Sequence, residues 1–128
     1  MASSSVQSYR DLVLWQRGMG LAEACYRVTA AFPRDEIYGM TTQIRRAATS
    51  VPANIAEGRG RESTGSFLQF LRVAQGSVKE LETHLLLAER VGIAEAEVVK
   101  PLLAECDEIG RMLRALIRSL QGKGSSER

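Results

Sequence analysis

The chain has 128 residues, of which 45% are hydrophobic and 25% charged, and its formal net charge is +2. This size suits a single domain over residues 1–128 with one hydrophobic core, and the composition excludes a mostly disordered chain. So small a net charge does not by itself imply a nucleic-acid partner. Only 5% of the residues are aromatic, and Leu and Ala dominate the apolar set. That balance favours close-packed helices over a β-sheet.

Apolar residues recur at three- and four-residue steps in four segments, which indicates an all-α protein. The predicted helices cover residues 11–31, 40–57, 64–90 and 95–120. Phe32-Pro33 ends the first helix, because proline disfavours the α conformation in the residue before it. Pro52 lies inside the second helix, where the stripe continues to Ile55, so we expect one kinked helix. The alternative is two short helices broken at Val51.

Short connections between these segments predict an antiparallel up-down-up-down four-helix bundle. We expect flexible ends at residues 1–8 and 122–128. No apolar run approaches the roughly 20 residues that cross a bilayer, and residues 1–5 lack the pattern of a secretory signal. Cys25 and Cys106 fall in apolar helical patterns, which predicts free buried thiols and a cytoplasmic location.

Several apolar side chains lie at angles that one narrow core cannot all bury: Trp15, Leu68, Leu86, Leu87, Met112 and Ile117. Surplus apolar surface of this kind predicts self-association, with a monomer as the alternative. In the third helix, the stripe places five side chains in the core: Phe70, Ala74, Val78, Leu81 and Leu85.

Four polar residues lie close to the apolar stripes of the second and third helices: Asn54, Glu57, Ser77 and Glu80. Antiparallel packing would let them meet in one cluster with Arg46 or Arg61. Two carboxylates in one pocket shift each other's proton affinity, so an acid–base site is one possible role. No nucleophile and base accompany them. We therefore expect an Arg–carboxylate network that fixes the helix register, and no enzymatic activity.

His84 is the only histidine, and with Glu80 it supplies at most two ligands. A zinc site usually has more, so we predict neither a metal site nor a cofactor.

Seven arginines are candidates for nucleic-acid binding: Arg45, Arg46, Arg59, Arg61, Arg111, Arg114 and Arg118. The first four lie near one end of the predicted bundle, and the last three share one side of the fourth helix. An oligomer would repeat such a patch, and phosphate contacts add electrostatically. The partner would be structured RNA or other nucleic acid. Against this role, no aromatic platform of the kind used for single-stranded RNA is interleaved with the arginines. The alternatives are inter-subunit salt bridges and a protein–protein interaction scaffold with no nucleic-acid role.

Several short motifs together resemble one family, that of the four-helix bundle proteins encoded in the intervening sequences of bacterial 23S ribosomal RNA genes. The motifs are Tyr9-Arg10-Asp11-Leu12, Trp15-Gln16, Phe32-Pro33, Glu36, Tyr38-Gly39, Gln43-Ile44-Arg45-Arg46-Ala47, Asn54-Ile55-Ala56-Glu57-Gly58, Arg61, Ala74-Gln75-Gly76-Ser77 and Glu80-Leu81-Glu82. The match covers about residues 8–120. The run through Asn-Ile-Ala-Glu-Gly is its most specific part.

The resemblance implies an antiparallel four-helix bundle, a ring-like homopentamer and a link to nucleic acid that is not established. A helical accessory protein of diversity-generating retroelements is similar in fold, and its association with nucleic acid supports an RNA or DNA partner by analogy only. One departure concerns the third helix, which in the family commonly starts with Ser followed three residues later by Glu. Here Ser63 is followed by Ser66, so the reciprocal capping box is absent.

Overall fold

The computed structural model of the protein describes residues 8–126, and those residues contain four α-helices and no strand. The helices are α1 (Val13–Thr29), α2 (Met40–Arg59), α3 (Thr64–Arg90) and α4 (Ala96–Ser126), with short 3-10 helices η1 (Tyr9–Asp11) and η2 (Arg34–Glu36). The predicted all-α class and the four helices are confirmed. The flexibility expected for residues 1–7 and 127–128 lies outside the described range.

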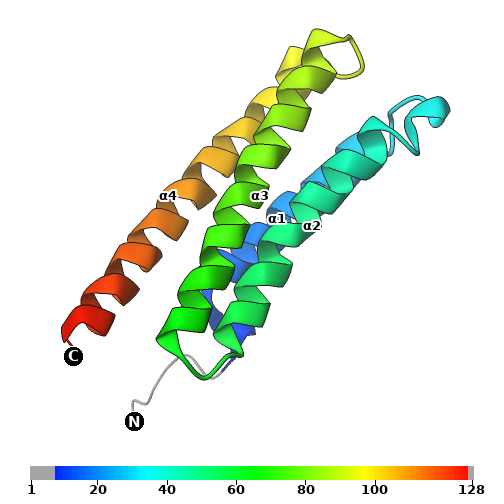
Figure 1. The fold of residues 1–128 in the computed structure, drawn as a ribbon. Helices are drawn as coiled ribbons and strands as arrows, with labels where there is room; N and C mark the ends of the chain where they lie inside the picture. Colours follow the sequence, from blue (N-terminus) through cyan, green and yellow to red (C-terminus); the bar gives the residue numbers. More distant parts are fainter. Residues whose placement is uncertain (1–7, 127–128) are drawn as a thin grey trace.

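The helices alternate in direction and pack around a common axis (Figure 1). Each helix contacts its two neighbours in the order α1, α2, α3, α4 and back to α1. The α2–α3 turn lies at one end of the bundle, and the α1–α2 and α3–α4 connections lie at the other (Figure 1). The α1–α2 pair and the α3–α4 pair therefore form opposite sides of the molecule.

Helix α4 differs most from its predicted extent, because it continues to Ser126, six residues past the expected end. The flexibility expected from residue 122 onward stays a prediction. One interior glycine costs a helix about 1 kcal/mol relative to alanine but leaves its backbone N–H available, so the hydrogen-bond ladder continues. Helix α1 is two residues shorter than predicted at each end, and α3 has the predicted bounds.

Helix α2 passes through Pro52 without interruption, which confirms one helix over two. Pro52 is buried against α1 at Gly18, where an added Cβ would lie 3.4 Å from the proline Cβ. Because Gly18 has no side chain, the two helices approach closely at the residue where α2 lacks a backbone donor.

The ends of α3 show why its bounds were predictable. At the start, the Ser63 hydroxyl accepts a hydrogen bond from the Ser66 N–H at 3.1 Å, so the N-cap forms without the reciprocal glutamate. At the end, Gly92 adopts a φ of 82°, in the left-handed region that favours glycine. The next N–H group, that of Ile93, then bonds to the Ala88 carbonyl at 2.9 Å and closes the helix.

The core consists of side chains from all four helices. The largest fully buried ones are Leu21, Ile44, Ile55, Leu71, Leu81, Leu85, Ile109 and Leu113. Four of the five core positions predicted on α3 are buried, and Phe70 is the exception. Its ring is half-buried under the Arg61 guanidinium, 5.0 Å from the ring centroid, because it lies where α3 leaves the α2–α3 turn.

The α2–α3 and α1–α4 contacts are tight. A Cβ on Gly58 of α2 would come within 2.8 Å of the Phe70 Cβ and 3.3 Å of the Phe67 carbonyl oxygen, so only glycine fits there. On the other side, Arg17 of α1 donates two hydrogen bonds to the Glu105 carboxylate of α4, at 2.7 and 2.8 Å. These bonds and the negative charge raise the pKa of Arg17.

Both cysteines lie in the core, Cys25 on α1 and Cys106 on α4, and both are unpaired as predicted. Burial raises the pKa of each thiol to about 12, and the charge of Glu82 adds to the effect at Cys106. Neither thiol is therefore a reactive nucleophile near neutral pH.

Candidate functional site

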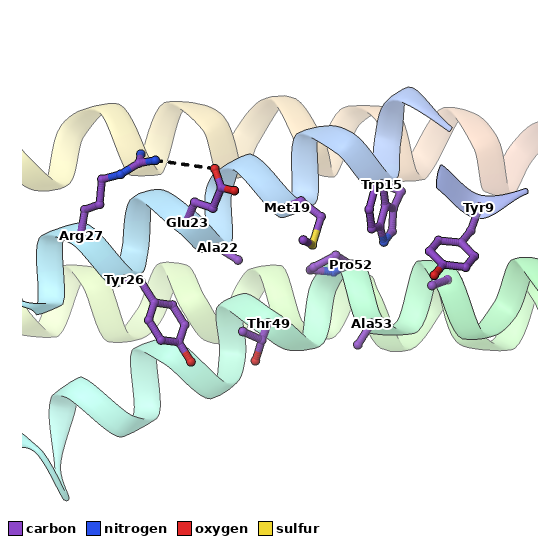
Figure 2. Close-up of a pocket in the computed structure, with 11 residues that line it drawn as sticks. Tyr9, Trp15, Met19, Ala22, Glu23, Tyr26, Arg27, Thr49, Pro52 and Ala53 are labelled. Atoms are coloured by element: carbon purple, nitrogen blue, oxygen red, sulfur yellow. Dashed lines mark ion pairs between the residues drawn. The ribbon is translucent and has the colours of Figure 1, made fainter. Parts of the chain in front are cut away.

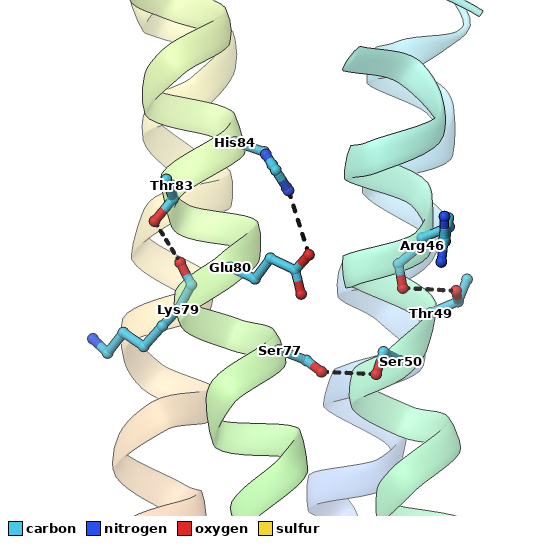
Figure 3. Close-up of polar contacts among 8 residues, drawn as sticks. All are labelled: Arg46, Thr49, Ser50, Ser77, Lys79, Glu80, Thr83 and His84. Atoms are coloured by element: carbon cyan, nitrogen blue, oxygen red, sulfur yellow. Dashed lines mark hydrogen bonds and ion pairs between the residues drawn. The ribbon is translucent and has the colours of Figure 1, made fainter. Parts of the chain in front are cut away.

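The structure joins two of the four residues of the predicted polar cluster, through a serine that the sequence analysis missed. The Ser50 hydroxyl on α2 lies 2.7 Å from the Ser77 hydroxyl on α3 (Figure 3). The Asn54 side-chain amide donates to the Ser50 carbonyl at 2.8 Å and to its hydroxyl at 3.0 Å. These hydrogen bonds fix the register of α2 against α3. Ser50 precedes Asn54 by four residues. That spacing places the two side chains on one face of a helix, and it could have identified Ser50 from the sequence.

The two carboxylates of the predicted cluster are far apart, so the structure forms neither the expected Arg–carboxylate network between α2 and α3 nor the paired-carboxylate alternative. Glu57 bonds Arg61 at 2.8 Å with its side chain 53% exposed, whereas Glu80 lies 3.6 Å from His84 (Figure 3). The antiparallel register explains the separation. Ser50 faces Ser77, so Glu80 lies level with Arg46 and shares a small cleft with it. Arg46 and Glu57 are eleven residues apart, roughly 16 Å along α2.

Three of the seven candidate arginines are bound within the bundle. The Arg45 guanidinium donates to the Thr29 hydroxyl at 2.8 Å and lies over the Tyr26 ring, 4.4 Å from its centroid. Arg61 is held by Glu57 and Phe70 as described above. Arg111 bonds Asp107 at 2.7 Å and lies 3.8 Å from Glu108. Arg45 links α2 to α1, whereas Arg61 and Arg111 form exposed pairs with residues four positions away, and each such pair stabilises the fold by about 0.5 kcal/mol or less.

Three others point outward without an ion pair to any carboxylate that the structure describes: Arg46, Arg114 and Arg118. Arg46 is on α2, and the other two are one turn apart on α4. Arg59 lies in the last turn of α2. The structure therefore spreads the candidate arginines over several faces and leaves only part of the set available for phosphate.

An apolar groove of about 690 Å³ lies between α1 and α2, and we call it the α1–α2 groove (Figure 2). Pro52, Ala53 and Ala56 form its α2 wall, and Trp15 and Met19 project from α1. The groove is apolar along most of its length. Its only ion pair joins Glu23 and Arg27 at 3.7 Å, near one end (Figure 2).

Aromatic side chains border this groove at both ends. Tyr9 of η1 packs edge-on against Trp15, with 5.3 Å between ring centroids. Tyr26 stays 45% exposed and Met19 39% exposed. The sequence analysis predicted surplus apolar surface at Trp15, but it did not locate a groove, since Pro52 and Ala53 came from a different predicted helix.

A second groove, of about 340 Å³, lies on the opposite side of the bundle between α3 and α4, and we call it the α3–α4 groove. Its lining is mostly polar and basic: Arg72, Gln75, Gly76, Val78, Lys79, Gly110 and Arg114. The sequence analysis identified only Arg114 among these. The available signal was a pair of cations seven residues apart on α3, Arg72 and Lys79, with a glycine between them.

None of the helices in the described range is both long and apolar enough for a membrane span. The same residues contain no group of three or more His, Cys, Asp or Glu side chains placed to hold a metal ion.

The chain matches the 23S rRNA-intervening sequence protein family over residues 10–115, and it belongs to that family. A solved structure has the same fold: the crystal structure of a protein of unknown function from the S23 ribosomal protein family of Bacteroides thetaiotaomicron. The two are 25% identical, the match covers 82% of this chain and 98% of that one, and the TM-score is 0.74. No curated protein matches the chain.

Proposed function

We propose that this protein is a non-enzymatic, cytoplasmic helical bundle that assembles with copies of itself, most simply as a homopentamer, and binds structured RNA or other nucleic acid through a repeated basic surface. The observation that most supports assembly is the α1–α2 groove. Burying apolar surface contributes roughly 25 cal/mol per Å², so a groove lined by Trp15, Met19 and Pro52 favours a covered state.

The rest of the exposed apolar surface supports a ring rather than a two-fold dimer. On the far side of the bundle, Leu86 and Leu87 are exposed near the end of α3. A contact between two different surfaces of successive copies is heterologous, and it closes into a ring when the rotation between copies fits.

Binding to nucleic acid is supported by the outward-pointing Arg46, Arg114 and Arg118. Phosphate contacts act by neutralising charge and releasing counterions, so their effects add. A five-fold assembly would repeat each arginine five times, although one copy has a net charge of only +2.

A titration of the full chain with a structured RNA and with duplex DNA, at about 50 mM and about 200 mM salt, tests this role. We expect binding to at least one polymer, with affinity that falls as salt rises. Absence of binding to both at the lower salt would contradict it.

A protein–protein scaffold with no nucleic-acid role is the second candidate, and the α1–α2 groove favours it too, because such a groove also suits an amphipathic helix of a partner. The titration separates the two candidates. If neither polymer binds, the scaffold function replaces the nucleic-acid function. Binding of a partner helix in the α1–α2 groove should then protect the fluorescence of Trp15 from quenching.

A further inference from the structure

The α3–α4 groove has an open base that helix packing does not require. Gly76 of α3 and Gly110 of α4 both line it. A Cβ on Gly76 would meet no atom within 4 Å, and one on Gly110 would meet only the Arg114 Nη1 atom, at 3.7 Å. Glycine in a helix interior destabilises the helix relative to alanine. The close helix approach that explains Gly58 is absent here, so these two glycines serve to keep the groove open.

The charges around the groove are predominantly positive. Arg72 and Arg114 have no carboxylate partner among the residues that the structure describes, and Lys79 reaches Glu82 at 3.2 Å with its side chain 73% exposed. The Glu82 side chain is only 20% exposed, so its carboxylate offsets part of the charge of Lys79, while the exposed ammonium group can contact a further anion. The nearest acids on α4, Asp107 and Glu108, already face Arg111. Arg72 and Arg114 therefore leave the groove with a net positive charge that faces solvent.

The spacing of these cations suits a chain of phosphates rather than a single anion. Arg72 and Lys79 are seven residues apart, which is roughly 10 Å along α3. The rise of about 3.4 Å per phosphate is measured along the duplex axis, and neighbouring phosphates lie farther apart along the strand itself, so this distance suits two neighbouring phosphates. Arg118 lies one turn beyond Arg114, and because α3 and α4 are antiparallel, it extends the row toward the Arg72 end. The Gln75 amide adds a hydrogen-bond donor for phosphate or sugar oxygens.

The same lining indicates which form of nucleic acid fits. No aromatic side chain lines the groove, so bases have no surface on which to stack. Contacts through guanidinium, ammonium and amide groups suit the backbone of a paired segment.

We infer that the α3–α4 groove is the phosphate-binding site of this protein, in which Arg72, Lys79 and Arg114 hold consecutive backbone phosphates of a paired nucleic-acid segment. The inference rests on the nucleic-acid role proposed above, and it moves that role away from Arg45, Arg61 and Arg111, which are bound within the bundle.

A fluorescence anisotropy titration with a labelled RNA hairpin tests the site, using the full chain at two salt concentrations. The test variant is Arg72→Gln with Arg114→Gln. The matched control is Arg61→Gln with Arg111→Gln, which removes the same charge from arginines that face carboxylates outside both grooves. We expect the test variant to bind at least 10-fold more weakly and to lose about 2 units of salt slope, and the control to change affinity less than about 3-fold.

A third variant fills the groove without changing charge. Gly76→Leu meets no neighbour at its Cβ, so the fold should hold and the melting temperature should not fall. We expect weaker RNA binding, because the side chain occupies the space between Arg72 and Arg114. Light scattering on each variant should show the wild-type mass. A test variant with altered mass would identify these arginines as subunit contacts and overturn the inference.

The remaining outcomes separate the inference from the proposed function. If the wild type binds the hairpin and both groove variants bind equally well, the phosphate site lies elsewhere and only this inference fails. The wild type is also titrated with a DNA duplex, and if it binds neither the hairpin nor the duplex at low salt, both fail. Displacement of the hairpin by inorganic phosphate or a nucleoside monophosphate at equal phosphate concentration would show a single-phosphate site and overturn the backbone assignment.

Discussion

The two sides of this bundle differ in the residues that border their grooves, although the same kind of helix pair forms each. Small residues open both: Ala53 and Ala56 in the α1–α2 groove, Gly76 and Gly110 in the α3–α4 groove. The first is bordered by aromatic and apolar side chains and the second by cations. In this fold, the small residues set where a groove can form, and the bordering side chains decide what it can bind.

Two contacts hold these sides together, α2 on α3 and α1 on α4. The α2–α3 contact has its closest approach at Gly58, and the α1–α4 contact brings the Arg17–Glu105 ion pair close to two buried thiols. If the two grooves have separate tasks, changes in the shared core should disturb both, and changes at one groove should leave the other intact.

The largest expected effect is that of Leu81→Ala, at a fully buried position of the shared core. Loss of transfer energy and the cavity left behind should lower the free energy of unfolding by about 2 to 5 kcal/mol. Urea denaturation measures it. Both sides should unfold in one transition, so tryptophan fluorescence from Trp15 and helical circular dichroism should give the same midpoint. Different midpoints would mean that the α1–α2 pair is a separate unit.

The α1–α4 contact should weaken in alkali because of its thiols. Below about pH 9 both thiols are protonated in the folded and unfolded chain alike. Between about pH 9 and about pH 12 only the unfolded chain releases these protons, so stability falls as pH rises, by about 1.4 kcal/mol per thiol for each pH unit. Urea midpoints at about pH 8 and about pH 10 under reducing conditions measure the loss.

The control for this prediction is the variant Cys25→Ala with Cys106→Ala. Other groups also titrate in alkali. The double variant should therefore keep the part of the stability loss that comes from those groups and should lack only the part that comes from the thiols. An equal fall in stability for both proteins would show that the thiols ionise in the folded state as easily as in the unfolded one.

At the α2–α3 contact, Gly58→Ala should lower the free energy of unfolding by about 1 to 3 kcal/mol through overpacking. The added methyl group meets the Phe67 carbonyl and the Phe70 Cβ, neither of which can move without the α3 backbone. Gly20→Ala on α1 is the matched control, because its Cβ meets nothing within 4 Å and it should gain up to about 1 kcal/mol. Thermal melts of both variants should shift in opposite directions, and a shared direction would contradict the close approach.

The smallest effect is expected for Glu57→Gln. A buried network would make this change costly, but Glu57 is half-exposed and paired only within its own helix end. Such a pair contributes about 0.5 kcal/mol or less, so the melting temperature should barely move. A large loss of stability would contradict this account and would indicate that Glu57 belongs to the interhelical network that the sequence analysis predicted.

Periodicity predicted the helices and most of the core, because an apolar stripe records which face of a helix is buried. It also located α3 to the residue, since Ser63 and Gly92 mark both ends. An apolar stripe does not show the register of one helix against another. For that reason the sequence analysis placed Glu57 and Glu80 in one cluster. The register of α2 against α3 depends on the hydrogen bond between Ser50 and Ser77 and on the close approach of α3 at Gly58. Both are contacts between residues far apart in the sequence.

The same limit applies to the candidate site. Pairs within one helix, such as Asp107 with Arg111, follow from a spacing of four residues. The Arg45 contacts with Thr29 and Tyr26 need α1 and α2 side by side, so the sequence could not separate this bound arginine from the outward-pointing Arg46. Each groove likewise combines residues from two helices.

The most direct test of the account is the mass of the particle, measured by light scattering after size exclusion at micromolar concentration for the wild type and for Met19→Glu. We expect the wild type at several times the 14.1 kDa chain mass, most simply about five times, and the variant at 14.1 kDa, because a charge in the α1–α2 groove should prevent another copy from covering it. A wild-type particle of 14.1 kDa would contradict the claim that the groove is an assembly surface.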